Sequence, residues 1–174
     1  MHKIYRSSDE AYPFLADATD DLRCDFELLT DRLASKTGLL RAICTDNHLA
    51  TELLKVAELV YHANPSLRTH VSLTLEEIEW VKSCVLRLQG EVEGRCNQFV
   101  LPVGNEPASL AHILRVDCKE IVRLLYRHLY AKHSVEPLLI DFFNLLSGYF
   151  FMLALKLNAL DHEEEVPFVS RNYK

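Results

Sequence analysis

Glycine and proline are scarce in this chain of 174 residues, which contains five of the first and six of the second. Long stretches without either residue favour helices over a succession of strands and turns. The chain also lacks a Gly-x-x-x-x-Gly-Lys-[Ser/Thr] sequence and a Gly-x-Gly-x-x-Gly sequence. These sequences build the common phosphate-binding loops, so such loops are not expected in this protein.

Basic residues are outnumbered and dispersed, since 19 Lys and Arg stand against 25 Asp and Glu and leave a net charge of -6. A nucleic-acid partner is not expected, because binding to a phosphate backbone needs a concentrated basic surface. The five cysteines include no Cys-x-x-Cys pair, and the first 21 residues contain no apolar stretch of signal-peptide length. We expect a cytoplasmic protein with reduced cysteines and no metal site.

Apolar residues recur at helical spacing in five segments, at about 20–44, 48–63, 75–90, 107–132 and 135–160. The clearest start is a capping box at Thr74-Leu75-Glu76-Glu77, in which Thr74 and Glu77 cap each other's backbone amides. The pattern predicts an all-α bundle of four up-and-down helices plus a fifth. The predicted organisation is an irregular arm at 1–20, a helical domain at 21–160 and a charged tail at 161–174.

The fifth helical segment is apolar nearly all round from Leu138 to Leu157, about the length of a membrane span. Polar residues interrupt it, and the other four segments are amphipathic, so a central helix of the bundle is the better interpretation and no membrane partner is expected. Two of the polar residues, Asn144 and Ser147, are expected to be buried. A buried amide without a partner costs about 1–3 kcal/mol, so these residues make either a hydrogen bond between helices or a ligand contact.

One face of the fourth helical segment carries an imidazole and three cations, because His112, Arg115, Lys119 and Arg123 are spaced at i, i+3, i+7 and i+11. Two interpretations stay open from the residues alone. The face is either solvated, with Glu120 and Arg123 paired at i, i+3, or it is an anion site. The second follows because Arg and Lys donate charge-assisted hydrogen bonds to phosphate.

Four motifs in this half of the chain occur in a recognisable order, namely Phe99-Val100-Leu101-Pro102-Val103-Gly104, His112-x-x-Arg115-x-x-Cys118-Lys119-x-x-x-Arg123, Asn144-x-Leu146-Ser147, and Ala154 with Asn158. Upstream of them, Thr30-Asp31-Arg32-Leu33 is followed by Gly38. Over about residues 25–160, this order and spacing resembles the PduO-type ATP:cob(I)alamin adenosyltransferases. The resemblance implies a divergent member of that family, with a five-helix bundle that assembles as a homotrimer and active sites between subunits.

The resemblance also implies roles for individual residues. The family transfers the 5′-deoxyadenosyl group of ATP to the Co(I) of a reduced cobalamin. Phe99 stands where the family places an apolar side chain under the corrin, which keeps a lower ligand off the cobalt, and His112 is a second corrinoid-facing residue. Arg115 matches an Arg that pairs with an Asp of another subunit, and Asp31 is in place to be that partner. Breaking such a pair from one side costs several kcal/mol.

On the nucleotide side, the resemblance implies that Lys119, Arg123 and Asn144 contact ATP with its Mg. Lys119 stands in place of an Arg, so charge is kept but the bidentate fork is lost. The family's N-terminal Thr-Gly-Asp-x-Gly-x-Thr loop has no counterpart, since no Gly precedes Gly38. Other positions lose family charges, with Glu120 in place of Arg, Val122 in place of Glu, and Leu145 and Gly148 in place of Arg and Asp.

Two functional interpretations follow from the resemblance. The first is an adenosyltransferase-like protein whose degraded nucleotide site leaves activity weak or lost. The second is a non-catalytic corrinoid-binding or scaffold protein on the same trimer. The residues alone also leave room for a helical oligomer that binds no small ligand.

Overall fold

The computed structural model describes residues 4–95 and 97–172. In these ranges the helices are α1 (Leu22–Ile43), α2 (Asn47–Ala63), α3 (Leu75–Glu91), α4 (Glu106–Tyr130) and α5 (Pro137–Leu160), with a 3-10 turn η1 (Asn64–Leu67). An isolated antiparallel bridge between Val100 and Pro167 is the one β feature of the described ranges. The predicted all-α five-helix bundle is confirmed. Residues 1–3 of the predicted arm, Cys96, and residues 173–174 of the predicted tail lie outside the described residues.

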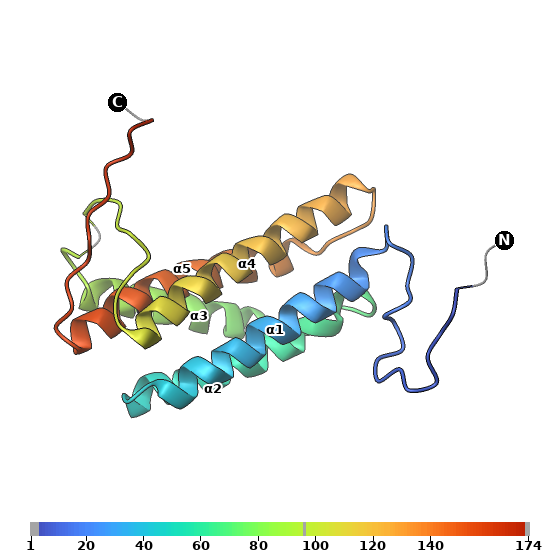
Figure 1. The fold of residues 1–174 in the computed structure, drawn as a ribbon, viewed down its shortest axis with the longest axis horizontal. Coiled ribbons are helices and arrows are strands. Elements are labelled where there is room, and N and C mark those ends of the chain that lie inside the picture. The colour runs from blue at the N-terminus through green and yellow to red at the C-terminus, as the bar shows by residue number, and fades with distance from the viewer. Residues whose placement is uncertain (1–3, 96, 173–174) are drawn as a thin grey trace.

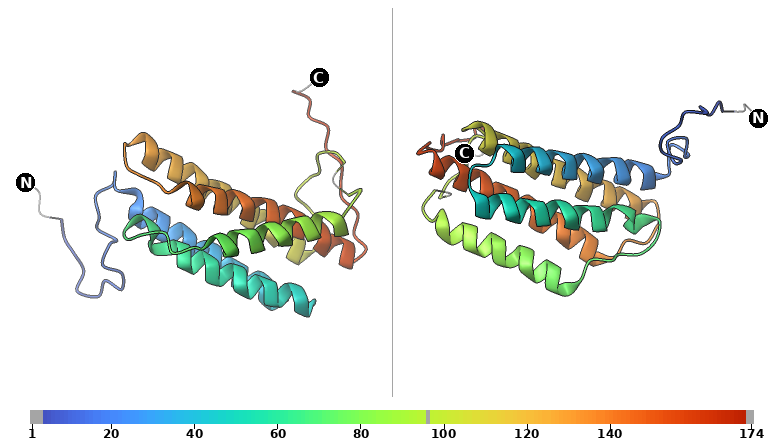
Figure 2. Two further views of the ribbon diagram at one scale, coloured as in Figure 1. Left: turned by 180° about the vertical axis from the view of Figure 1, so that it is seen from behind. Right: turned by 90° about the horizontal axis from the view of Figure 1, so that it is seen from below.

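Consecutive helices run in opposite directions along one long axis (Figure 1). α1 packs against α2 and α4, α4 packs against α5, and α5 packs against α3. Figure 2 shows α3 on the flank of the bundle. The N-terminal arm lies at one end of the long axis, while the C-terminal segment and the loop before α4 lie together at the other (Figure 1).

Side-chain caps fix where several helices begin. The predicted capping box of α3 is present, since Glu77 N donates to Thr74 Oγ1 at 3.2 Å and Thr74 N donates to Glu77 Oε2 at 2.8 Å. Asp46 caps α2 by accepting from Leu49 N at 2.9 Å. Asn105 caps α4 in the same way. These local bonds satisfy backbone amides that a helix start leaves free.

α5 is the central helix. By length and composition it would pass for a membrane span, but 56% of its most apolar window is buried inside the bundle. Phe142, Phe143 and Phe150 have no exposed surface, and Phe143 packs edge-on against Phe26 of α1 at 6.0 Å between ring centroids. Each such side chain contributes roughly 2–3 kcal/mol of hydrophobic stabilisation. The interpretation as a helix packed on several sides therefore fits the structure.

A buried carboxylate joins three helices. Glu52 of α2 accepts a hydrogen bond from the Tyr149 hydroxyl of α5 at 2.9 Å and another from Arg87 of α3 at 2.7 Å. Burial, together with the negative charge of Glu52, raises the pKa of Tyr149 well above its usual value, so the phenol stays protonated and donates. Because both carboxylate oxygens have partners, the network stabilises one arrangement of these helices.

Replacing Tyr149 by Phe is expected to lower the free energy of unfolding by about 1–3 kcal/mol, because a hydrogen bond to a buried carboxylate is lost. Chemical denaturation followed by circular dichroism measures it. Tyr5→Phe is the matched control, since Tyr5 is exposed in the N-terminal arm. A Tyr149→Phe protein as stable as the control would show that the network does not hold the helices together.

Candidate functional site

His112 and Arg115 lie on the side of α4 that faces α5. The His112 ring is 4% exposed and its centroid is 6.2 Å from that of the Phe151 ring, while the Arg115 guanidinium lies 6.0 Å from the same ring. In the described part of the chain, His112 Nδ1 and Arg115 Nε are buried and have no hydrogen-bond partner. Since nearly all buried polar atoms of native proteins are paired, this corner has polar bonding capacity that the single chain does not use.

The imidazole of His112 is neutral at physiological pH. Burial lowers its pKa to about 4, and the positive charge of Arg115 acts in the same direction, whereas the carboxylate of Glu165 opposes them. A neutral imidazole offers one donor and one acceptor. His112 therefore contributes hydrogen-bonding capacity, and not charge, to this face of α4.

The loop that leads into α4 is held by Asn158, whose side chain is fully buried. Asn158 Nδ2 donates to Val103 O at 3.3 Å, and its Oδ1 accepts from Asn105 N at 3.2 Å. Gly104 lies between these two contacts with φ +144°, and a Cβ atom there would stand 2.0 Å from Asn158 Oδ1. Only glycine permits this backbone conformation and this close approach.

The same loop pairs with the C-terminal segment, which was predicted only as a charged tail. Phe168 N donates to Phe99 O at 2.8 Å, next to the Val100–Pro167 bridge. The buried carboxylate of Glu165 accepts from Arg95 Nη2 at 3.0 Å. These contacts place part of the tail beside the Phe99 loop, at the end of the bundle where α4 begins (Figure 1).

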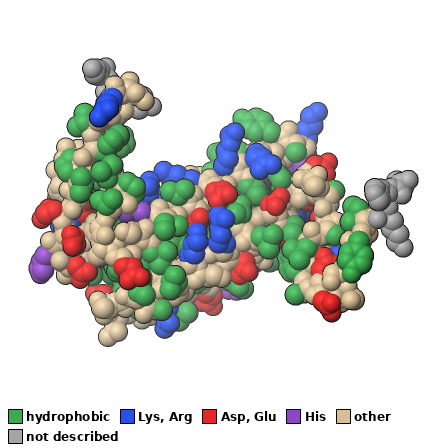
Figure 3. Space-filling model, viewed as in Figure 1, with side chains coloured by type: hydrophobic (Ala, Val, Ile, Leu, Met, Phe, Trp, Pro, Cys, Tyr) green, Lys and Arg blue, Asp and Glu red, His purple; other side chains and the backbone are tan. Residues whose placement is uncertain are grey.

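Phe99 is 83% exposed on this loop. Other large apolar side chains of the loop and of the C-terminal segment are exposed around it, namely Leu101, Val103, Val166, Phe168 and Val169. Figure 3 shows hydrophobic side chains gathered along the projection that these segments form. A contiguous group of exposed apolar side chains is typical of a binding surface. An apolar ligand or a partner protein bound there would cover Phe99.

Lys119 and Arg123 are exposed on α4, and in the described part of the chain neither takes part in an ion pair. The Glu120–Arg123 pair that the sequence left open does not form. Glu120 is instead ion-paired with Arg32 of α1, 88 residues away. Two cations on this face thus have no ion-pair partner in the described chain, while the neighbouring Glu120 is neutralised by Arg32 of another helix.

A second acidic residue of α4 extends this contact between helices. Asp117 is buried and pairs with Arg32 at 3.2 Å and with Lys36 at 2.7 Å. Sequence reasoning missed the network. The sequence does contain two cations at i, i+4, Arg32 and Lys36, and two acidic residues at i, i+3, Asp117 and Glu120. Such spacing does not reveal which helices are neighbours.

The expectation of a buried Asn144 is wrong. Asn144 is exposed and its Nδ2 donates to Ile140 O of its own helix at 3.0 Å. Ser147 makes the hydrogen bond between helices, since its Oγ donates to the backbone oxygen of Arg115 at 3.1 Å. Three residues along a helix leave two side chains about 60° apart, which is enough to turn one toward solvent and the other toward α4.

Asp31 is exposed on α1, where its Oδ1 accepts from the Tyr61 hydroxyl of α2 at 2.6 Å. In the described chain it forms no ion pair with Arg115, which lies against α5. The salt bridge expected between Asp31 and Arg115 of different subunits therefore stays a prediction. Sequence reasoning missed the contact of Tyr61 with Asp31, because no pattern within α2 connects Tyr61 to α1.

Replacing Gly104 by Ala is expected to lower the free energy of unfolding by about 2 kcal/mol or more, because the added Cβ collides with Asn158 and the backbone conformation is strained. Gly38→Ala is the control, since nothing lies within 4 Å of a Cβ at that helical position. Thermal denaturation compares them. A Gly104→Ala protein as stable as wild type would show that the Asn158 contact is not restrictive.

The low pKa of His112 predicts a dependence of stability on pH. An unfolded His titrates near pH 6.5, whereas folded His112 titrates near 4, so between these values the unfolded chain binds a proton that the folded protein does not. The stabilising effect is full above about pH 6.5 and is lost as the pH falls toward 4. When the pH falls from about 7 to about 5, the free energy of unfolding of His112→Gln should decrease by about 2 kcal/mol less than that of wild type. Denaturant titrations at the two pH values measure the difference, and His70→Gln, at an exposed position, is the matched control.

Comparison with known proteins places the sequence in a family. Residues 18–157 match the family model described as cobalamin adenosyltransferase, while no curated protein matches the chain significantly. Three solved structures of a PduO-type ATP:corrinoid adenosyltransferase from Lactobacillus reuteri are similar in fold. A phenylalanine-to-alanine variant complexed with cobalamin and ATP has a TM-score of 0.76 at 21% identity, covering 86% of this chain and 87% of that one.

A phenylalanine-to-histidine variant of the same enzyme, also complexed with cobalamin and ATP, has a TM-score of 0.78 at 21% identity and covers 95% of this chain and 98% of that one. An arginine-to-lysine variant complexed with ATP has a TM-score of 0.75 at 23% identity, covering 86% and 88%. At these identities the structures establish the fold, and the family match extends over most of the sequence. This chain belongs to the cobalamin adenosyltransferase family.

Proposed function

We propose that this protein binds a corrinoid at a site between the subunits of a homotrimer, with Phe99 and His112 facing the corrinoid. The observation that carries the proposal is the pair of buried, unpartnered nitrogens, His112 Nδ1 and Arg115 Nε, on the α4 face. A corrinoid has a broad apolar ring edged with amide groups, which donate and accept hydrogen bonds. Such a ligand would use the exposed apolar ring of Phe99 and the polar atoms of His112 and Arg115 that the single chain leaves unpaired.

The subunit contact completes the site in this proposal. Arg115 is half-buried with its Nε unpartnered, and Asp31 is an exposed carboxylate that forms no ion pair within the described chain. An unpaired, partly buried cation is unfavourable, so pairing Arg115 with Asp31 of a neighbouring subunit stabilises the assembly. Exposed apolar residues on the same helices support a subunit interface, namely Leu28 and Leu39 on α1 and Ile113 and Val116 on α4.

In this proposal, the site still binds a nucleotide, but weakly. Lys119 and Arg123 remain exposed and unpaired among the described residues, so they are free to meet a phosphate group, with Asn144 on the neighbouring helix. Glu120 repels an anion less than its charge alone suggests, because Arg32 neutralises it. ATP with Mg then binds through fewer contacts than a glycine-containing loop would supply, and adenosyl transfer to the cobalt is slow or lost.

Phe99 has a distinct part in this function. In the family reaction, the reduced cobalt attacks the 5′ carbon of ATP, so that the adenosyl group passes to the cobalt and triphosphate leaves. An apolar side chain at the lower face of the corrin excludes water and other ligands there, which eases cobalt reduction. Phe99 is apolar, exposed and carried by a loop that Asn158 and the C-terminal segment hold in place. Its fixed backbone supports that role.

Titration with cob(II)alamin, with and without Mg-ATP, tests the proposal by optical and electron paramagnetic resonance spectroscopy. We expect binding of the corrinoid in both conditions and a four-coordinate Co(II) signal. Phe99→Ala should remove this signal. Leu86→Ala, which shortens an exposed apolar side chain on α3, is the matched control and should behave as wild type.

Two further measurements can contradict the proposal, namely the oligomeric state by light scattering and ligand binding by calorimetry. A wild-type protein that is monomeric at micromolar concentration would contradict the intersubunit site. The proposal is that the corrinoid binds more tightly than ATP. Tight ATP binding without any corrinoid binding would contradict it.

A further inference from the structure

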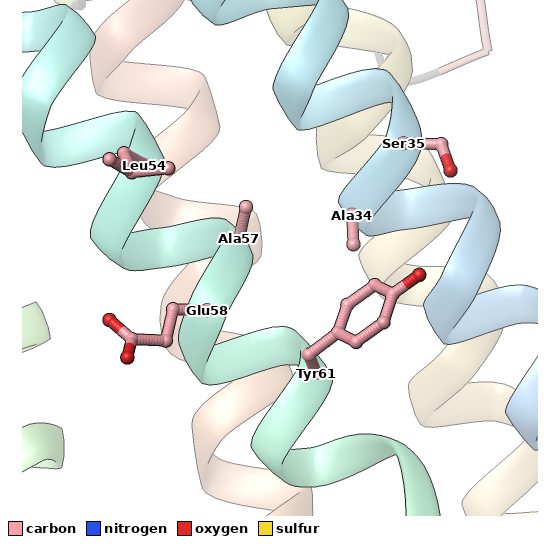
Figure 4. A pocket seen from close by; sticks show the side chains of 6 residues that line it. All are labelled: Ala34, Ser35, Leu54, Ala57, Glu58 and Tyr61. Atoms are coloured by element: carbon pink, nitrogen blue, oxygen red, sulfur yellow. The ribbon is translucent and has the colours of Figure 1, made fainter.

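A groove between α1 and α2 holds the side chain of Tyr61. The groove has a volume of about 340 Å³, and Ala34 and Ser35 of α1 lie opposite Ala57 and Tyr61 of α2. Figure 4 shows the Tyr61 ring lying across the groove from α2 toward Ala34. Because Ala34 and Ala57 are small, the ring can cross to α1, although Tyr61 remains 59% exposed.

The Tyr61 hydroxyl ends on Asp31, one turn before Ala34 on the same face of α1. It donates to Asp31 Oδ1 at 2.6 Å, a length typical of a bond to an ionised carboxylate. That bond, together with the negative charge of Asp31, raises the pKa of Tyr61, so the phenol remains a donor at neutral pH. The bond uses one of the two carboxylate oxygens, and within the described chain the other has no hydrogen-bond partner.

We propose that Tyr61 is a positioning residue, whose hydroxyl holds Asp31 Oδ1 so that Oδ2 is presented to Arg115 of a neighbouring subunit. This inference rests on the proposed function, in which the two charged residues pair across the interface. An exposed Asp otherwise samples several side-chain rotamers. Holding it in one of them lowers the entropy lost when the subunits associate.

The consequence reaches the ligand site through α4. Arg115 lies beside Phe151, as His112 does, so the orientation of its guanidinium affects the same corner that carries the unpartnered His112 Nδ1. Tyr61 therefore affects corrinoid affinity indirectly, through Asp31 and Arg115. It lies in the groove between α1 and α2 and does not contact the ligand itself.

A double-mutant cycle separates this role from simple packing, because Tyr61→Phe keeps the ring in the groove and removes only the hydroxyl. Wild type, Tyr61→Phe, Asp31→Asn and the double variant are compared for trimer dissociation, by analytical ultracentrifugation, and for cob(II)alamin affinity, by spectroscopic titration. We expect Tyr61→Phe to weaken both by about three- to tenfold. Asp31→Asn should weaken both further, and the double variant should be no worse than Asp31→Asn. Tyr5→Phe is the control and should match wild type.

Different results overturn different statements. If Tyr61→Phe equals wild type, or if its effect multiplies with that of Asp31→Asn, then Tyr61 does not act through Asp31 and the inference is overturned while the proposed function stands. If Asp31→Asn equals wild type in both assays, the intersubunit pair is overturned, and the role of Tyr61 with it. Unfolding curves of Tyr61→Phe at a concentration that dissociates the trimer should match wild type, and a large loss of stability there would indicate a structural role instead.

Discussion

The buried amide of Asn158 is the contact on which the site end of the bundle depends. It has no exposed surface, so its hydrogen-bonding groups must be satisfied inside the protein. They are satisfied by the backbone of Val103 and Asn105, on the two sides of Gly104. Because an unsatisfied buried amide costs about 1–3 kcal/mol, the loop cannot leave α5 without that penalty. The start of α4 and the Phe99 loop are fixed relative to the central helix for this reason.

Charges on the outer helices are balanced between elements more than within them. Arg32 of α1 serves Asp117 and Glu120 of α4 together, and Arg87 of α3 serves Glu52 of α2 and Glu91 of its own helix. What stays unbalanced is therefore informative. Among the cations without an acidic partner in the described chain are Lys119 and Arg123, on the exposed face of α4, and two of the unpartnered buried nitrogens, His112 Nδ1 and Arg115 Nε, belong to the same helix. This helix thus has bonding capacity left over for a ligand or another subunit.

Much of the fold could be predicted because its determinants are local. The capping box at Thr74 and Glu77, the proline in the first turn of α4 and the continuous apolar pattern of α5 each specify structure within a few residues along the chain. Part of the site followed as well, since helical spacing alone puts His112 and Arg115 on one side of α4. Asn144 shows the limit of that reasoning. Helical spacing predicts the direction in which the Asn144 side chain leaves the axis of α5. Whether that direction leads into protein or into water depends on which elements pack against α5.

The sequence by itself determined five helices, their approximate ends, and a row of polar side chains along one of them, because backbone capping and hydrophobic periodicity act over one or two turns. Only the tertiary structure decided which of those side chains meet. Arg32 and Glu120 are 88 residues apart, and Tyr61 reaches Asp31 across a groove between helices. Such contacts depend on which helices become neighbours and on how each is rotated about its axis. Both are set by the packing of the whole core, in which the helices bury apolar faces against one another.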